Sequence, residues 1–190
     1  MRLADERDIL RIVTEDEWMM DVLRAAQSLR LPDWWVCAGF VRSKIWDALH
    51  GFAERTPLPD VDVVYFDPVR TDESEEKELE RRLRRLLPDV PWSVKNEARM
   101  HVVNDLPPYS SAVDAISKFP ETATALGLSL DERGRVRLAA PHGVEDVLRM
   151  KLKPTPLFAT PALSWVYEER VDKKDWKSRW PMIEVARMKR

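Results

Sequence analysis

The sequence predicts a mixed α/β fold, a sheet flanked by helices, and three observations carry this prediction. Short apolar runs of strand length alternate with helix-like segments through the first hundred residues. Of the 190 residues, 44% are apolar, which is enough for one buried core. The 31 basic side chains are matched by 33 acidic ones, so the whole molecule is not a nucleic-acid-binding polycation.

Two helices are expected before the first strand. The first covers residues 6–13. Thr14 followed by Glu17 has the spacing of a capping box, which predicts the start of a second helix. Pro32 then ends the helical pattern.

A buried strand and a third helix follow. Residues 34–38 form a short apolar run between breakers, as in a strand buried on both faces. Val41, Ile45 and Leu49 recur at helical spacing, in a helix that ends near Gly51. The turn between strand and helix predicts a positive φ at Gly39.

The remaining elements are predicted from the same signals. Residues 51–59, with one glycine and two prolines, are expected to form a loop. Apolar runs predict strands at 61–66 and 92–95, and a turn that contains Gly134 predicts a hairpin over 128–138. A helix is expected over 72–87, where acidic residues precede basic ones. Further helices are expected at 110–116, 143–152 and 165–177.

Two acidic residues at strand spacing are the clearest functional signal. Asp60 and Asp62 alternate with Val61 and Val63, so both carboxylates are expected on one face of a strand. Carboxylates this close repel each other unless a cation lies between them, and Mg²⁺ is held by one or two carboxylates together with substrate phosphates. Paired acids at a solvated strand end are the alternative interpretation.

The turn at Gly39 complements this acidic pair. Exposed backbone N–H groups and a helix N-terminus can receive a phosphate there. Arg42, on the first turn of the helix, can reach the same phosphate or pair with Asp47 or Asp60. A nucleotide–metal site is therefore predicted where the two segments meet.

The order of these segments resembles the nucleotidyltransferase superfamily of the polymerase-β kind, and within it the head region of tRNA CCA-adding enzymes. That family carries a G-G-x-V-R-D segment followed by D-x-D, and this chain has Ala38-Gly39-Phe40-Val41-Arg42-Ser43 and then Asp60-Val61-Asp62. A second block resembles the family over residues 121–126, 131–134, 140–147 and 153–156, with Thr122, Thr124 and Asp146 at its polar positions. The resemblance spans residues 34–156 and is closest to a bacterial branch of unassigned substrate.

The resemblance implies a nucleotidyltransferase fold and a set of site residues. It places Asp60 and Asp62 as metal ligands and catalytic residues for one or two Mg²⁺ ions. It places Gly39, Phe40, Arg42 and Ser43 in the nucleotide site. It also implies a nucleotidyltransferase-like domain over residues 1–156, followed by a helical C-terminal extension over 157–190 that packs on it.

A third carboxylate completes the metal site in the resembled families, on a neighbouring strand. The corresponding strand here reads Trp92-Ser93-Val94-Lys95 and contains no acid. Glu97, just after this strand, is the nearest candidate, and Asp114 is the next. Lys95 is a candidate phosphate ligand, since its ammonium can replace part of a metal's charge. Arg99 can contact a phosphate or a base, or form a surface ion pair.

The C-terminal residues combine positive charge with flat rings. Lys173, Lys174, Lys177 and Arg179 alternate with Trp176 and Trp180, a pattern that can bind single-stranded nucleic acid. Lysine stems that pack beside core tryptophans give the same pattern, and this interpretation is favoured.

Two functions are consistent with these observations. The first is a Mg²⁺-dependent nucleotidyltransferase that moves a nucleoside monophosphate from an NTP to a hydroxyl acceptor. The acceptor is expected to be a small molecule or a protein, with RNA less favoured because the chain is small. The second is a catalytically inactive nucleotide-binding or interaction module of the same fold.

The setting is expected to be cytoplasmic, without a membrane. Cys37 is the single cysteine, which excludes an internal disulfide and fits a reducing compartment. The first eight residues are largely charged, and no stretch approaches the ~20 apolar residues needed to cross a bilayer.

Overall fold

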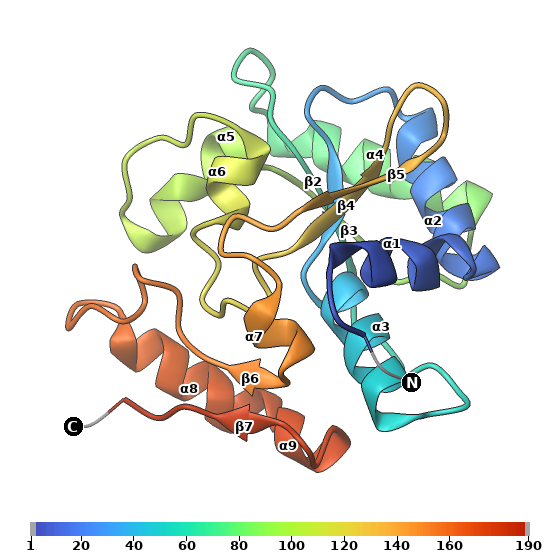
Figure 1. Ribbon diagram of the computed structural model, residues 1–190. Coiled ribbons are helices and arrows are strands. Elements are labelled where there is room, and N and C mark those ends of the chain that lie inside the picture. Colours follow the sequence, from blue (N-terminus) through green and yellow to red (C-terminus); the bar gives the residue numbers. More distant parts are fainter. Residues whose placement is uncertain (1–2, 189–190) are drawn as a thin grey trace.

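A five-stranded mixed sheet forms the centre of the computed structural model, which describes residues 3–188 (Figure 1). The strand order is β3-β2-β1-β4-β5. β2 and β3 are parallel, and the other neighbouring pairs are antiparallel. The strands are β1 (Trp35–Cys37), β2 (Val61–Tyr65), β3 (Trp92–Asn96), β4 (Gly127–Leu130) and β5 (Val136–Ala139). The predicted mixed α/β fold is confirmed.

The larger core lies on the face of the sheet that carries Val61, Val63 and Tyr65. Four helices supply its other side, with α2 against β4, α3 against β1 and β2, and α4 against β3. Ile9, Leu23 and Ile45, from three of these helices, are fully buried. The helices are α1 (Glu6–Thr14), α2 (Glu17–Ser28), α3 (Gly39–His50) and α4 (Glu73–Leu86).

A smaller core covers the opposite face. Trp35, Cys37 and Val64 from β1 and β2 pack there with Ala112 and Ile116 of α6 (Ala112–Ile116). Between β3 and α6 the chain forms the short helices α5 (Glu97–Met100) and η1 (His101–Asn104). Because side chains alternate along a strand, Asp62 shares this second face with Val64.

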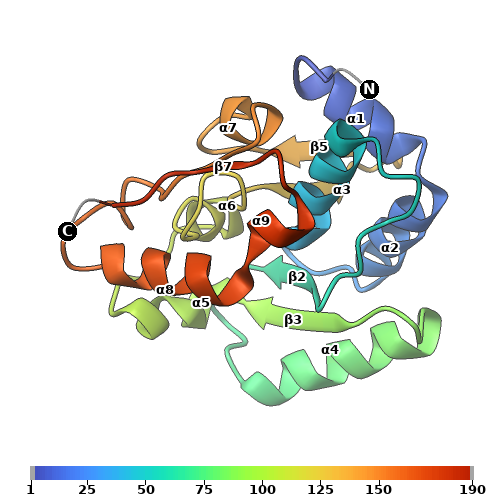
Figure 2. The ribbon, with the colours of Figure 1, turned by 90° about the horizontal axis from the view of Figure 1, so that it is seen from below.

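The C-terminal elements lie beside α3 and α7 (Figures 1 and 2). Trp180 donates from Nε1 to Asp47 Oδ1 at 2.8 Å, and the backbone N–H of Met182 donates to His50 Nε2 at 3.1 Å. Residues 157–188 are therefore attached directly to α3. The elements are α7 (Glu145–Leu148), β6 (Lys151–Leu152), α8 (Ser164–Lys174), α9 (Trp176–Arg179) and β7 (Glu184–Val185), and β6 and β7 pair in parallel.

Two local predictions are corrected. The cap of α2 is Asp16, which accepts from the Met19 N–H at 3.1 Å, whereas Thr14 ends α1 and donates to the Leu10 carbonyl. The helix expected over 143–152 is limited to α7, because the chain turns at Met150 with φ 54° and enters β6. Pairing with β7 outweighs the local helical pattern there.

The strand-to-helix turn before α3 also differs from expectation. The residue with positive φ is Ala38, at φ 59° and ψ −121°, and not Gly39. An L-residue in this region is strained by its Cβ. The first turn of α3 still begins beside the start of β2, because Cys37 at the end of β1 pairs with Asp62.

None of the helices within residues 3–188 is both long and apolar enough to cross a membrane.

Ala38→Gly should stabilise the protein. Glycine relieves backbone strain of about 1–3 kcal/mol and costs roughly 0.5–1 kcal/mol in chain entropy, so we expect a net gain of about 1 kcal/mol. Urea unfolding of the two proteins measures this gain. Gly51→Ala, at a helix end with φ 70°, is the matched control and should lose stability; a loss in Ala38→Gly as well would contradict the assignment of strain.

Candidate functional site

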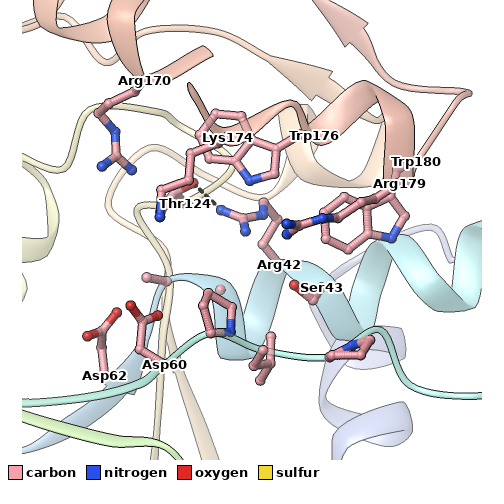
Figure 3. Close-up of a pocket in the computed structure, with 15 residues that line it drawn as sticks. Arg42, Ser43, Asp60, Asp62, Thr124, Arg170, Lys174, Trp176, Arg179 and Trp180 are labelled. Carbon is pink, nitrogen blue, oxygen red and sulfur yellow. Dashed lines mark hydrogen bonds between the residues drawn. The ribbon is translucent and has the colours of Figure 1, made fainter. Parts of the chain in front are cut away.

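Asp60 and Asp62 lie together at the start of β2 (Figure 3). Asp60 immediately precedes the strand, and Asp62 pairs in register with Cys37 of β1 and Ser93 of β3. Burial, and then the charge of Asp60, raise the pKa of Asp62 to about 6. The two carboxylates therefore meet on one face, as their spacing predicts, and repel each other there.

A pocket opens beside this acidic pair. It is formed by the turn before α3, the loop before β2, the segment before β4, and helices α8 and α9. Its lining residues are Ala38, Gly39, Arg42, Ser43, Pro57, Leu58, Pro59, Asp60, Asp62, Thr124, Arg170, Lys174, Trp176, Arg179 and Trp180.

Arg42 is the most buried charge of the pocket, at 7% exposed. Its Nη1 donates to Thr124 Oγ1 at 2.8 Å. Its guanidinium carbon lies 5.0 Å from the ring centre of Trp176, 5.4 Å from that of Trp46 and 5.8 Å from that of Trp180. Burial lowers the pKa of Arg42 to about 10, so the side chain is still charged at neutral pH. It thus contacts Thr124 and three rings rather than forming an ion pair with Asp47 or Asp60.

Two buried polar atoms in the pocket have no partner among the described residues. They are Nε of Arg42 and Oγ of Ser43. Ser43 is 2% exposed. Buried polar groups are nearly always hydrogen-bonded, so the protein leaves the hydrogen-bonding capacity of these two atoms unused.

The C-terminal helices supply three further cations to the pocket. Arg170 is held by the fully buried Glu121, with Nε donating to Oε1 at 2.6 Å. Lys174 and Arg179 are exposed and form no ion pair within residues 3–188. Acid therefore lines one side of the pocket and positive charge the other (Figure 3).

Asp47 fixes the loop that leads to the acidic pair. It is 6% exposed, and its carboxylate accepts from the N–H and hydroxyl of Thr56 at 2.9 and 2.6 Å. The same carboxylate accepts from Trp180. One buried acid on α3 therefore positions both the loop before β2 and the end of α9.

The predicted site residues divide into two groups. Gly39, Arg42, Ser43, Asp60 and Asp62 line the pocket. The other four lie elsewhere: Phe40 in the larger core against Trp18, Glu97 buried at the start of α5, and Lys95 and Arg99 in ion pairs with Glu76 of α4.

Glu97 is buried near Asp62 without lining the pocket. It is 6% exposed. Burial, and then the charge of Asp62, raise its pKa to about 7. Opposite Asp62 on β3 lies Ser93, so the strand itself contributes a hydroxyl and no third acid.

Several pocket residues were not predicted as site residues. Thr124 belongs to the second block of the resemblance, which was a usable signal. Lys174, Trp176, Arg179 and Trp180 belong to the C-terminal pattern of charges and rings, for which packing was favoured. The packing interpretation is confirmed for the rings, since Trp176 and Trp180 are buried, and the two cations are exposed at the pocket.

The residues present fit a hard divalent cation. Two carboxylates face one open pocket, and the charge of Asp60 helps to raise the pKa of Asp62, an unfavourable interaction that a cation between them removes. Within residues 3–188 no cluster of three or more acidic, histidine or cysteine side chains has metal-binding geometry. Mg²⁺ suits such a site, because it is commonly bound by one or two carboxylates plus substrate phosphates.

A mixed sheet with two carboxylates beside a cation-lined pocket defines the class of nucleotidyl-transfer domains. The family model described as "Nucleotidyltransferase" matches residues 24–185. The chain belongs to this nucleotidyltransferase family.

Solved structures agree with this assignment. A protein whose NMR structure "reveals a CCA-adding enzyme head domain" is 34% identical, with 96% of each chain covered and a TM-score of 0.85. A CCA-adding enzyme in complex with CTP shares the fold, at 11% identity and a TM-score of 0.59, and another with ATP does so at 12% identity and a TM-score of 0.56. The matches cover 96% and 98% of this chain, but 43% and 44% of those chains. The comparison with curated proteins finds no match.

Glu97→Gln should stabilise the protein above neutral pH. Because the pKa of Glu97 is raised from 4.5 to about 7 on folding, the folded state binds the extra proton, and wild-type stability falls as pH rises through this window. We expect a gain of about 2 kcal/mol at pH 8 and little change at pH 4, measured by urea unfolding without metal. Equal stability of the two proteins at pH 8 would contradict the burial of an ionised Glu97.

Asp47→Asn should lower stability by about 1–3 kcal/mol, because an amide oxygen can replace only one carboxylate oxygen and the half-buried N–H of Thr56 is left facing another donor. Asp89→Asn, an exposed acid between α4 and β3, is the matched control and should change stability by less than about 0.5 kcal/mol. Thermal unfolding of both variants checks this. A loss no larger than the control's would show that Asp47 does not fix the loop and α9.

Proposed function

We propose that the protein is a Mg²⁺-dependent nucleotidyltransferase that transfers a nucleoside monophosphate from an NTP to a hydroxyl acceptor. The observation that carries this proposal is the pocket in which Asp60 and Asp62 face buried, unpartnered donors of Arg42 and Ser43. One side suits a metal and the other a phosphate chain. Family membership supports the same chemistry.

In the proposed reaction, the acceptor oxygen bonds to the α-phosphorus and the bond from that phosphorus to the bridging oxygen breaks, so that pyrophosphate leaves. Asp60 and Asp62 would hold the metal, which supplies charge neutralisation and a more acidic hydroxyl. The first turn of α3 and Arg42 orient the phosphates. The hydroxyl proton is proposed to pass to solvent water, because Glu97 is buried outside the pocket.

The acceptor is proposed to be a small molecule or a protein carrying a free hydroxyl. Nothing in the pocket of described residues distinguishes these acceptors from the 3′ end of an RNA, and the fold is shared with CCA-adding enzymes. An acceptor screen should therefore include all three classes, with release of pyrophosphate as the readout.

A catalytically inactive nucleotide-binding module is the second candidate, and Ser93 favours it. This residue occupies the position opposite Asp62 on β3 where a third acid would complete the metal site. An inactive module should bind Mg-NTP and release no pyrophosphate with any acceptor.

Mg-ATP should raise the unfolding temperature of the wild-type protein, and Asp60→Asn and Asp62→Asn should each abolish most of that rise. The reason is that ligand binding stabilises only the folded state, and each variant removes a proposed metal ligand. A thermal-shift titration with Mg-ATP measures both effects.

Asp89→Asn serves as the control and should keep the full rise. The proposal is wrong if ATP stabilises the two site variants as strongly as the wild type, or if it stabilises none of the proteins.

A further inference from the structure

We propose that Asp47 is a positioning residue for the acidic pair, and that it makes the metal affinity of that pair depend on Trp180, at the opposite end of the pocket (Figure 3). Asp47 itself does not line the pocket. The proposal rests on the proposed function in one respect, because it takes Asp60 and Asp62 as the metal ligands. It adds that the C-terminal residues control the metal site without touching it.

The first support is one oxygen atom shared by two donors. Oδ1 of Asp47 accepts from the hydroxyl of Thr56 at 2.6 Å and from Nε1 of Trp180 at 2.8 Å. Oδ2 accepts from the N–H of Thr56 at 2.9 Å. Asp47 is buried, so the loss of a donor leaves its charge less well compensated. A shift of Trp180 therefore disturbs the same carboxylate that holds Thr56.

The second support is the stiffness of the segment that leads to the acidic pair. Its sequence is Thr56-Pro57-Leu58-Pro59-Asp60. Each proline ring fixes its own φ and restricts the residue before it, so four successive residues have little conformational freedom. Leu58 also packs against the larger core. A displacement at Thr56 is therefore passed on to Asp60 and not absorbed between them.

The third support is that Asp60 depends on this segment for its place. The pairing of β2 with β3 begins at Val61 and includes Asp62. Asp60 precedes the first paired residue. The sheet thus fixes one carboxylate of the pair, and the loop fixes the other. The separation of the two carboxylates, on which metal binding depends, is set in part by Asp47.

A second contact holds the same loop but does not involve the C-terminal residues. Arg55 donates to the two carboxylate oxygens of Asp16 at 2.9 and 3.0 Å, and its guanidinium carbon lies 4.0 Å from the ring centre of Trp18. This contact fastens the loop to the start of α2. Of the two carboxylates that hold the loop, Asp47 is the one that also accepts from Trp180.

The test is a titration of the full chain with Mn²⁺ as the metal probe, without nucleotide, followed through the paramagnetic resonance signal of the free ion. Asp47→Asn and Trp180→Phe should each weaken Mn²⁺ binding by about tenfold, the usual effect of removing a group that orients a metal ligand. Asp60→Asn should weaken it as well, which assigns the bound ion to the acidic pair.

Trp46→Phe is the matched control for Trp180→Phe. Trp46 is buried against the same guanidinium, that of Arg42, but its Nε1 donates to the Val147 carbonyl and not to Asp47. Both substitutions remove one indole N–H from the same group of rings. The control should lose stability and bind Mn²⁺ as the wild type does.

Two variants of Thr56 separate positioning from a merely structural role. Thr56→Val removes the hydroxyl and should weaken Mn²⁺ binding, whereas Thr56→Ser keeps the hydroxyl and should bind as the wild type does. Thr56→Val combined with Trp180→Phe should weaken binding by less than the product of the two single effects, because both act through one carboxylate. A structural role would lower the unfolding temperatures and leave the metal affinity of the folded variants unchanged.

The outcomes distinguish this inference from the proposed function. The unfolding temperature without metal shows which variants are folded, and Asp47→Asn and Thr56→Val decide the matter should Trp180→Phe fail to fold. Unchanged Mn²⁺ affinity in the folded variants, or an equal loss in Trp46→Phe, would overturn the positioning role and leave the proposed function standing. A wild type that binds no Mn²⁺, or binds it in a way that Asp60→Asn does not weaken, would overturn both.

Discussion

The pocket depends on the burial of one guanidinium group, that of Arg42. The charge lies against Trp176 of α9 and against Trp180, which follows α9, and it is hydrogen-bonded to Thr124. Because a buried charge is costly unless it is compensated, the three surrounding segments are held in one arrangement. This contact joins α3, the segment before β4 and α9, all of which line the pocket. It therefore links the C-terminal helices to the turn before α3.

The acidic side of the site could be predicted because its geometry is local. Asp60 and Asp62 share a face by strand periodicity, whatever the rest of the chain does. The cationic side depends on tertiary approach, since Arg170 and Lys174 come from a helix far downstream. Lys174 belongs to the pattern of charges and rings that is visible in the sequence, whereas Arg170 lies outside it, and the pattern does not say which surface it faces.

The errors in the local predictions have physical causes. A glycine was expected to take the positive φ, yet Ala38 takes it one residue earlier. The helix over 143–152 was shortened because β6 gains a strand partner that only the folded chain supplies. Conversely, the strands expected at 61–66 and 92–95 follow directly from their apolar patterns and are confirmed as β2 and β3.

The group of indole rings around Arg42 has a consequence for how ligands can be observed. Trp46 and Trp180 lie edge to face with ring centres 5.2 Å apart, and Trp176 and Trp180 line the pocket itself. Indole emission responds to nearby charge and to water. The protein thus carries an intrinsic fluorescent reporter at the wall of its pocket, and occupancy can be followed without any label.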